Sequence, residues 1–199
     1  MGAKIEGLGT NKILVEGVTK LQKTNYKVML DRIEAGTYAL AVAIAGGEIE
    51  LVGAEKKLLT FFLNVLDTIG VEYFVTENSI IFKRNSNSLN SIDITTEPYP
   101  GFPTDLQAQL MAVMAISNGT SVITENIFEN RFMHAPELIR MGAKIKLKNN
   151  LAIVEGVKKL KGAEVMATDL RASVSLVLAG LVAEGTTNID RIYHIDRGY

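Results

Sequence analysis

A pattern that occurs three times along the chain limits the fold more than any other feature of the sequence. The string MGAKI lies at Met1–Ile5 and again at Met141–Ile145, and a weaker copy, IGVEY, lies at Ile69–Tyr73. Similarity at a nearly constant spacing indicates an architecture built from repeated structural units. The sequence therefore predicts three repeat units, at about residues 2–69, 70–141 and 142–199.

The units share one order of predicted elements. Alternating, β-branched stretches come first and predict strands. An aspartate then opens an apolar run rich in small residues, and because aspartate is a good N-cap and glycine a good C-cap, each run predicts a helix. Since these runs are apolar on nearly every face, we expect the helices to be buried. They start at Asp31, Asp105 and Asp169 and reach Gly46, Gly119 and Gly185.

A short strand is predicted after each of these helices, and a second helix follows it in the first two units. The second helices are expected at about Glu55–Thr68 and at Pro136–Met141, where proline suits a first turn. The third unit has no such helix before Tyr199. We therefore expect residues 1–199 to form one repeat domain whose third unit is incomplete, as a section of a longer chain.

Composition excludes several classes of function. With 21 Lys+Arg against 22 Asp+Glu, the net charge is -1, so broad attraction to nucleic acid is not expected. We expect no membrane association either, because no apolar stretch approaches the roughly 20 residues of a spanning helix. There is no cysteine and there are two histidines, so no metal site is expected. The chain is typical of a soluble intracellular protein.

The three helix-opening aspartates are candidates for chemistry. Equivalent helices should start on the same side of the domain, where their free N–H groups favour anions. Each aspartate is either a helix cap or a functional carboxylate, which would act as a general base or as a ligand. Arg32 follows Asp31 directly and Arg171 lies two residues after Asp169, whereas Asp105 has no cation near it in sequence. A carboxylate without such a neighbour is freer to accept a proton, which singles out Asp105.

Arginines cluster in two segments that follow the last strands of the second and third units. FENRFMH and DRIYHIDRGY should come to similar ends of the fold. Arginine suits two-pronged recognition of carboxylate or phosphate, and surface ion pairing is the alternative. The histidines are interpreted as hydrogen-bonded structural residues. The residues concerned are Glu129, Arg131, His134, His194 and Arg197.

Four motifs carry a resemblance to a known family. FPTDLQAQ (102–109), ENIFENRFMHAPEL (125–138), GAEVMATDLRAS (162–173) and AEGTTNIDRIYHIDRGY (183–199) closely resemble the UDP-N-acetylglucosamine enolpyruvyl transferases, also called UDP-N-acetylglucosamine 1-carboxyvinyltransferases. The similarity runs through essentially the whole chain. It implies an α/β fold, the inside-out α/β barrel, in which buried parallel helices are surrounded by small mixed sheets in a threefold repeat.

The resemblance also implies an activity and its partners. The family transfers enolpyruvyl from phosphoenolpyruvate to the 3-hydroxyl of UDP-N-acetylglucosamine and releases phosphate. This is the first committed step of bacterial peptidoglycan synthesis, it takes place in the cytoplasm, and it needs no cofactor. The complete enzyme has two such domains with the active site between them, so a second domain is an expected partner.

Site residues are carried over by position in the motifs. Asp105 matches the aspartate that contacts the sugar nucleotide and is proposed to deprotonate its hydroxyl. Arg197 matches the arginine that binds the phosphoenolpyruvate carboxylate, and Ile127 matches a residue whose backbone contacts the sugar nucleotide. The remaining matches line the active site, and among these Arg131 is expected to bind substrate. The lining positions are Asp31, Glu129, Arg131, Asp169 and Arg171.

This sequence departs from the family in extent. The family's proton donor and the residues that hold its phosphate groups lie in the other domain, which is absent here. We therefore expect the chain alone to lack transferase activity. One alternative is a non-catalytic module, either a truncated product or half of a split enzyme. A weaker alternative is a related repeat enzyme, either the shikimate-pathway enolpyruvyl transferase or one that acts on RNA ends, and the quoted motifs argue against it.

Overall fold

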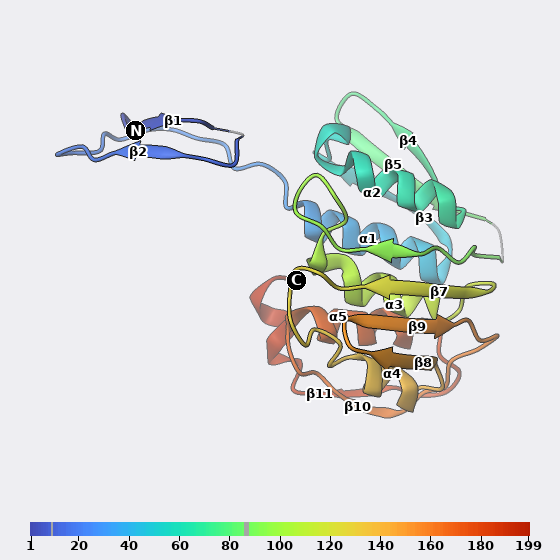
Figure 1. The fold of residues 1–199 in the computed structure, drawn as a ribbon. Helices are drawn as coiled ribbons and strands as arrows, with labels where there is room; N and C mark the ends of the chain where they lie inside the picture. Colours follow the sequence, from blue (N-terminus) through green and yellow to red (C-terminus); the bar gives the residue numbers. More distant parts are fainter. Residues whose placement is uncertain (9, 86–87) are drawn as a thin grey trace.

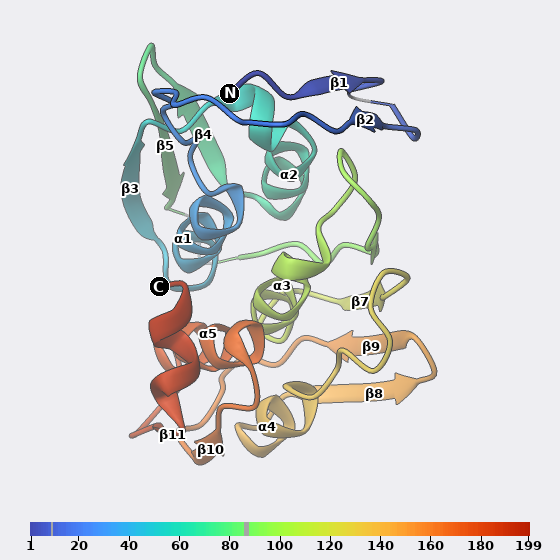
Figure 2. The same ribbon diagram turned by 90° about the vertical axis from the view of Figure 1, so that its left-hand side faces the viewer.

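The computed structural model describes residues 1–8, 10–85 and 88–199, and the side chain of Arg197 is also outside the description. Its centre is a group of three helices, one from each repeat unit, that contact one another in every pair. Figures 1 and 2 show them inside, with the strands around them. They are α1 (Arg32–Ala45), α3 (Gln107–Met114) and α5 (Leu170–Gly180).

The burial of these helices explains their composition. All eight residues of α3 are buried, and so are most residues of α1 and α5. Small side chains let the helices approach closely: a Cβ added to Gly36 would lie 2.5 Å from the side chain of Leu106. The prediction of buried helices rich in small residues is confirmed.

Two helices end earlier than predicted. Helix α1 ends before Gly46, as expected, but α3 stops at Met114 and α5 at Gly180 rather than at Gly119 and Gly185. After α3 the Ser117 hydroxyl donates to the Met114 carbonyl, 2.9 Å away, which satisfies an acceptor that a longer helix would use. Gly119 and Gly185 have φ of +107° and +93°, and they lead into the next strands.

Small sheets surround the helices, and each of two sheets joins neighbouring units. The hairpin that opens a unit pairs antiparallel with the strand that follows the previous unit's helix: β5 pairs with β3, and β9 with β7. The three-stranded sheet has the order β3-β5-β4, the four-stranded sheet β6-β7-β9-β8, and β10 pairs parallel with β11. The bounds are β3 (Gly47–Val52), β4 (Glu72–Val75), β5 (Ser79–Arg84), β6 (Ile94–Thr95), β7 (Thr120–Thr124), β8 (Lys144–Lys148), β9 (Leu151–Glu155), β10 (Glu164–Met166) and β11 (Asn188–Asp190).

The predicted second helices are present as α2 (Lys56–Ile69) and α4 (Ala135–Arg140). A repeat glycine follows each of them. Gly70 and Gly142 have φ of +95° and +94°, in the region where glycine reverses the chain after a helix without strain. The glycine of the repeated motif therefore marks the end of a helix and the turn into the next hairpin.

The first hairpin is placed differently from the other two. Strands β1 (Lys4–Glu6) and β2 (Leu14–Glu16) pair only with each other. Figure 1 shows them beside the body of the molecule, reached through an extended stretch. Every described residue from 1 to 29 is exposed except Val18, which is half-buried. This hairpin thus contributes little to the core.

The candidate site lies at the ends of the central helices, on the side where η1 (Thr104–Leu106) and η2 (Ile192–Arg197), two short 3-10 helices, are found. Across the described ranges, no helix combines the length and apolar character that crossing a membrane requires.

Candidate active site

The three aspartates at equivalent repeat positions differ in their contacts, because two of them cap a helix and the third does not. Asp31 caps α1 through Oδ1, which accepts from the N–H groups of Ile33 and Glu34 at 2.7 and 3.2 Å. Asp169 caps α5 in the same way, accepting from the N–H groups of Arg171 and Ala172 at 2.8 and 2.9 Å.

Asp105 caps nothing, because the chain enters α3 through a 3-10 turn. Asp105 is the middle residue of that turn, and α3 begins two residues later at Gln107. Its carboxylate is therefore not held by helix N–H groups. The expectation that an aspartate N-caps each of the three helices is therefore wrong for Asp105, whose side chain is available for other contacts.

Two arginines contact Asp105 in space although none is near it in sequence. Nη2 of Arg131 lies 2.7 Å from Oδ1, and Nε of Arg171 lies 3.5 Å from the same oxygen. Asp105 therefore has no cation near it along the chain, but the fold brings two arginines to its carboxylate. Both contacts use Oδ1, and within the described residues no donor is bound to Oδ2.

Asp105 opens onto a cavity of about 560 Å³. The lining includes four of the predicted residues, Asp105, Arg131, Asp169 and Arg171, so the structure brings these together. Two guanidinium groups beside it favour an anionic ligand. The cavity is also lined by residues that the sequence interpretation did not name individually: Phe128, Asn130, Met133 and Leu170.

The other predicted residues lie outside this lining. Ile127 and Glu129 line a neighbouring cavity of about 370 Å³, which shares Arg131 with the first. The carboxylate of Asp31 remains at the start of α1 as a cap. The backbone of Arg197 ends η2, and the position of its side chain is among the features that the structure leaves undescribed.

Tyr199 is a functional candidate that the sequence interpretation missed. Its hydroxyl is 2.7 Å from Oγ1 of Thr37 in α1, 3.4 Å from Nε2 of Gln109 in α3 and 3.1 Å from Nη1 of Arg171 in α5. One phenol therefore meets a side chain from each repeat unit, and the three helices must start at the same end. These contacts also orient Arg171 beside Asp105.

Glu125 is a second missed residue. It is buried, with 4% of its surface exposed, and it accepts hydrogen bonds from two threonine hydroxyls and two backbone N–H groups. It is the first residue of the motif ENIFENRFMHAPEL, but nothing in the sequence distinguishes it from an exposed glutamate.

His134 is buried next to the site, with 2% of its surface exposed. Burial lowers the pKa of its imidazole from 6.5 to about 4, because charging the ring inside the protein is costly; Asp169 opposes this shift and Arg131 adds to it. A neutral, buried ring fits the interpretation that His134 is structural. Its Nε2 has no hydrogen-bond partner in the described part of the chain, so the predicted hydrogen bond is not seen there.

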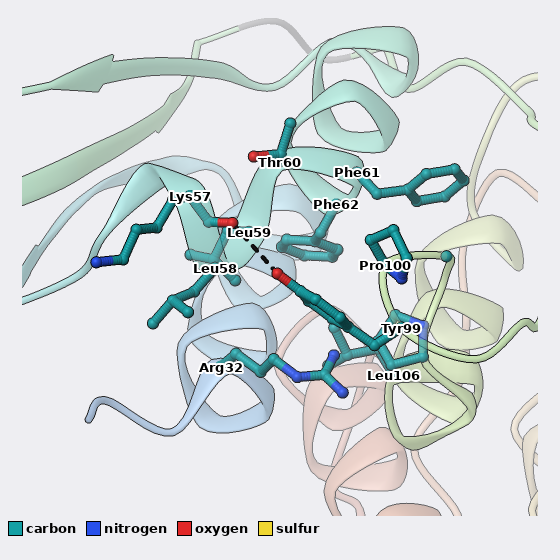
Figure 3. A pocket seen from close by; sticks show the side chains of 12 residues that line it. Arg32, Lys57, Leu58, Leu59, Thr60, Phe61, Phe62, Tyr99, Pro100 and Leu106 are labelled. Carbon is teal, nitrogen blue, oxygen red and sulfur yellow. Dashed lines mark hydrogen bonds between the residues drawn. The ribbon is translucent and has the colours of Figure 1, made fainter. Parts of the chain in front are cut away.

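A smaller cavity, of about 120 Å³, lies between α1, α2 and the segment 99–103 (Figure 3). There the guanidinium of Arg32 lies 5.3 Å from the ring centre of Tyr99, whose hydroxyl donates weakly to the carbonyl of Lys57 at 3.5 Å. None of the predicted site residues lines it. We therefore place the candidate active site at the larger cavity beside Asp105.

Comparison with known sequences decides the family. The profile described as EPSP synthase (3-phosphoshikimate 1-carboxyvinyltransferase) matches residues 1–199. The chain belongs to the EPSP synthase family. Within this family, it is 59% identical over its full length to the UDP-N-acetylglucosamine 1-carboxyvinyltransferases of Methylobacterium radiotolerans and Agrobacterium fabrum. It spans 46% of each, so the chain covers about half the length of the curated relatives it matches.

Solved structures of enolpyruvyl transferases confirm the fold class. The enolpyruvyl transferase NikO from Streptomyces tendae superimposes with a TM-score of 0.88 at 27% identity, over all of this chain and 48% of that one. EPSP synthase from Acinetobacter baumannii gives 0.72 at 22% identity, covering 49% of that chain, a likeness of fold alone. The arrangement is the inside-out α/β fold of these enzymes, and the described residues form no closed barrel.

Proposed function

We propose that this chain supplies part of the active site of an enzyme that transfers enolpyruvyl from phosphoenolpyruvate to the 3-hydroxyl of UDP-N-acetylglucosamine. Phosphate is released, and the step belongs to peptidoglycan synthesis in the bacterial cytoplasm. The names of the relatives, at 55–59% identity, support the substrate assignment. The partners are the two substrates and the half of the enzyme that those relatives have in addition.

One observation carries the chemistry. Oδ1 of Asp105 is held by Arg131 and Arg171, whereas Oδ2 has no donor among the described residues and belongs to a carboxylate that opens onto the cavity. A carboxylate fixed through one oxygen presents the other in a defined position, as a general base requires. The proton of the sugar 3-hydroxyl passes to Oδ2 as the hydroxyl oxygen bonds to C2 of phosphoenolpyruvate, and C3 takes a proton from the donor in the half of the enzyme that this chain lacks. Loss of a proton from C3 and of phosphate from C2 then restores the double bond in the product.

The remaining residues bind and orient. The arginines around the cavity suit the carboxylate and phosphate groups of the substrates, and Arg197 is assigned to the phosphoenolpyruvate carboxylate. The N–H of Ile127 already donates to Glu125 at 2.9 Å. Its carbonyl is therefore the backbone group left to contact the sugar nucleotide. Asp31, Glu129 and Asp169 are given supporting roles.

A chimera tests the proposal. This chain replaces the matching part of the Methylobacterium radiotolerans relative, and phosphate release is measured with phosphoenolpyruvate and UDP-N-acetylglucosamine. We expect Asp105→Ala to lower kcat by about a hundredfold or more, because general bases typically contribute that much. Asp67→Asn, an exposed change on α2, is the matched control. Normal turnover by the Asp105 variant would exclude Asp105 as the base.

Two further assays separate the alternatives. Offering 3-phosphoshikimate in place of the sugar nucleotide tests the shikimate-type activity, and we expect no turnover. The 199-residue chain assayed alone tests whether it suffices, and we expect no phosphate release because it spans 46% of its relatives. A chimera that is inactive with every acceptor would favour a non-catalytic module.

A further inference from the structure

Glu125 is a buried glutamate that has no role in the reaction proposed above. Burying a charge is unfavourable unless hydrogen bonds compensate for the lost water, and Glu125 has four. Oε1 accepts from the hydroxyl of Thr96 at 2.7 Å and from the N–H groups of Ile127 and Phe128 at 2.9 and 3.0 Å. Oε2 accepts from the hydroxyl of Thr104 at 2.8 Å.

The direction of the hydrogen bond to Thr104 is fixed by its other partner. Nη1 of Arg131 lies 2.8 Å from Oγ1 of Thr104, and a guanidinium group can only donate. The hydroxyl therefore accepts from Arg131, and its own hydrogen points to Oε2 of Glu125. The result is a series of two hydrogen bonds with a fixed direction, in which Arg131 donates to Thr104 and Thr104 donates to Glu125.

The same guanidinium reaches the candidate base. While Nη1 of Arg131 is bound to Thr104, Nη2 donates to Oδ1 of Asp105 at 2.7 Å. The ring of Phe128, whose N–H is bound by Glu125, lies against this group, with its centre 5.1 Å from the guanidinium carbon. Arg131 is thus held on one side by groups that depend on Glu125 and presents its other side to Asp105.

We propose that Glu125 is a positioning residue of the active site. Through Thr104 it fixes the guanidinium of Arg131, and through Arg131 the carboxylate of Asp105. Through Oε1 it sets the backbone at Ile127. The inference rests on the proposed function, since it assigns to one buried side chain the placement of both the base and a contact to the sugar nucleotide.

A glutamine at this position separates positioning from folding. Its Oε1 would still accept from Thr96 and from the N–H groups of Ile127 and Phe128. Its Nε2, however, would donate to Thr104, so that the threonine hydroxyl receives two donors and its own hydrogen loses its acceptor. Glu125→Gln therefore keeps the hydrogen bonds to the backbone of the loop. It weakens the bond from Arg131 to Thr104, because the threonine hydroxyl is no longer polarised by donating to a carboxylate.

The first test uses the 199-residue chain and needs no substrate. Hydrogen-exchange protection of the guanidinium protons of Arg131 is measured by NMR in Glu125→Gln, Thr104→Val and the double variant. We expect each single change to lower protection about tenfold, because Thr104→Val removes the charge-assisted bond from Arg131 and Glu125→Gln weakens it. The double variant should show no further loss, and the N–H of Ile127 should stay protected in Glu125→Gln.

The control is Glu137→Gln. Glu137 is also a buried glutamate, 8% exposed, and accepts from the N–H of Met166 at 3.0 Å, but it lies on α4 away from this chain of bonds. We expect it to leave Arg131 unchanged. Unchanged protection of Arg131 in Glu125→Gln, or effects of Glu125→Gln and Thr104→Val that add, would overturn the proposal.

The second test measures catalysis in the chimera. We expect kcat/KM for UDP-N-acetylglucosamine to fall about tenfold or more in Glu125→Gln and in Thr104→Val, and no further in the double variant, whereas Glu137→Gln keeps the parent value. Loss of Arg131 protection with unaltered kinetics in an active chimera would overturn the positioning role. An inactive parent chimera would instead contradict the proposed function, and the exchange experiment would still decide the hydrogen-bond chain.

Discussion

At the scale of single residues, the candidate site is surrounded by polar side chains that are buried away from solvent. Glu125, Gln109 and Ser173 are each at most 4% exposed, and the hydrogen bonds of Glu125 and Gln109 lead to the neighbourhood of Asp105. Sequence reasoning singled out Asp105 as a candidate from its surroundings along the chain and from the family motif. It could not identify Tyr199, because the partner of its hydroxyl in α1, Thr37, is 162 residues away.

His134 should make the stability of the chain depend on pH. Because its folded pKa is about 4 and its unfolded value is 6.5, the unfolded chain takes up a proton first as the pH falls. The contribution is fully present above pH 6.5, decreases as the pH falls towards 4 and levels off below that, for a total of roughly 3 kcal/mol.

Urea unfolding at a series of pH values measures this contribution. His134→Gln should flatten the dependence of the unfolding free energy on pH between 6.5 and 4. His194→Gln, a change at a half-exposed ring that lies against Tyr193, is the comparison for the effect of the substitution itself. An unaltered slope in the His134 variant would show that the ring does not titrate as the structure implies.

At the scale of elements, what could be predicted depended on local physical chemistry. The starts of α1 and α5 follow from aspartate capping, and the second helices α2 and α4 lie within a residue or so of their predicted bounds. The 3-10 turn before α3 was not predictable. Asp105 could either cap the helix or lie inside a 3-10 turn, and tertiary contacts rather than the local sequence decide between these two backbone conformations. The same applies to the early end of α3 at Met114.

Gly156 and Gly17 occupy the same place in two copies of the repeat, in VEGV after β9 and β2, and allow a matched substitution. A Cβ at Gly156 would lie 1.7 Å from the backbone oxygen of Ser117, whereas at Gly17 nothing lies within 4 Å. We expect Gly156→Ala to destabilise the chain by about 3 kcal/mol or more, because the backbone must move, and Gly17→Ala to change stability by less than about 0.5 kcal/mol. Thermal or urea unfolding compares the two, and equal effects would contradict the close packing at Gly156.

At the scale of the whole molecule, the internal repeat predicted equivalent buried helices, and the family resemblance implied the small sheets around them. The structure contains both, and it also shows that two of the sheets join neighbouring units. The site was less predictable because it forms where different units meet. Arg131 belongs to the second unit and Arg171 to the third, and both contact the carboxylate of Asp105. Such pairings depend on how the units are packed, which the motifs alone do not reveal.

The exposed first hairpin predicts where a protease acts first. Residues 17–30 join β2 to α1 and contain Lys20, Lys23 and Lys27, all exposed. Trypsin should cut there before it cuts after Lys159, the repeat equivalent of Lys20, which lies between the backbone-bonded residues Val157 and Lys161. A time course read by mass spectrometry checks the order, and earlier cleavage after Lys159 would contradict the placement of the hairpin.

The 3-10 turn at Asp105 has a consequence for how a repeated chain acquires a function. Three similar units place an aspartate at three equivalent positions. An aspartate that N-caps a helix uses its carboxylate to stabilise the fold, so that carboxylate is not available for other contacts. In the middle unit, a single 3-10 turn leaves the carboxylate of Asp105 without helix N–H groups to cap, whereas Asp31 and Asp169 still cap their helices. Under the proposed assignment of Asp105 as the base, this departure from symmetry distinguishes the reactive carboxylate from the two that cap helices. A search of other internally repeated proteins for reactive groups could begin with the copy that departs from the others.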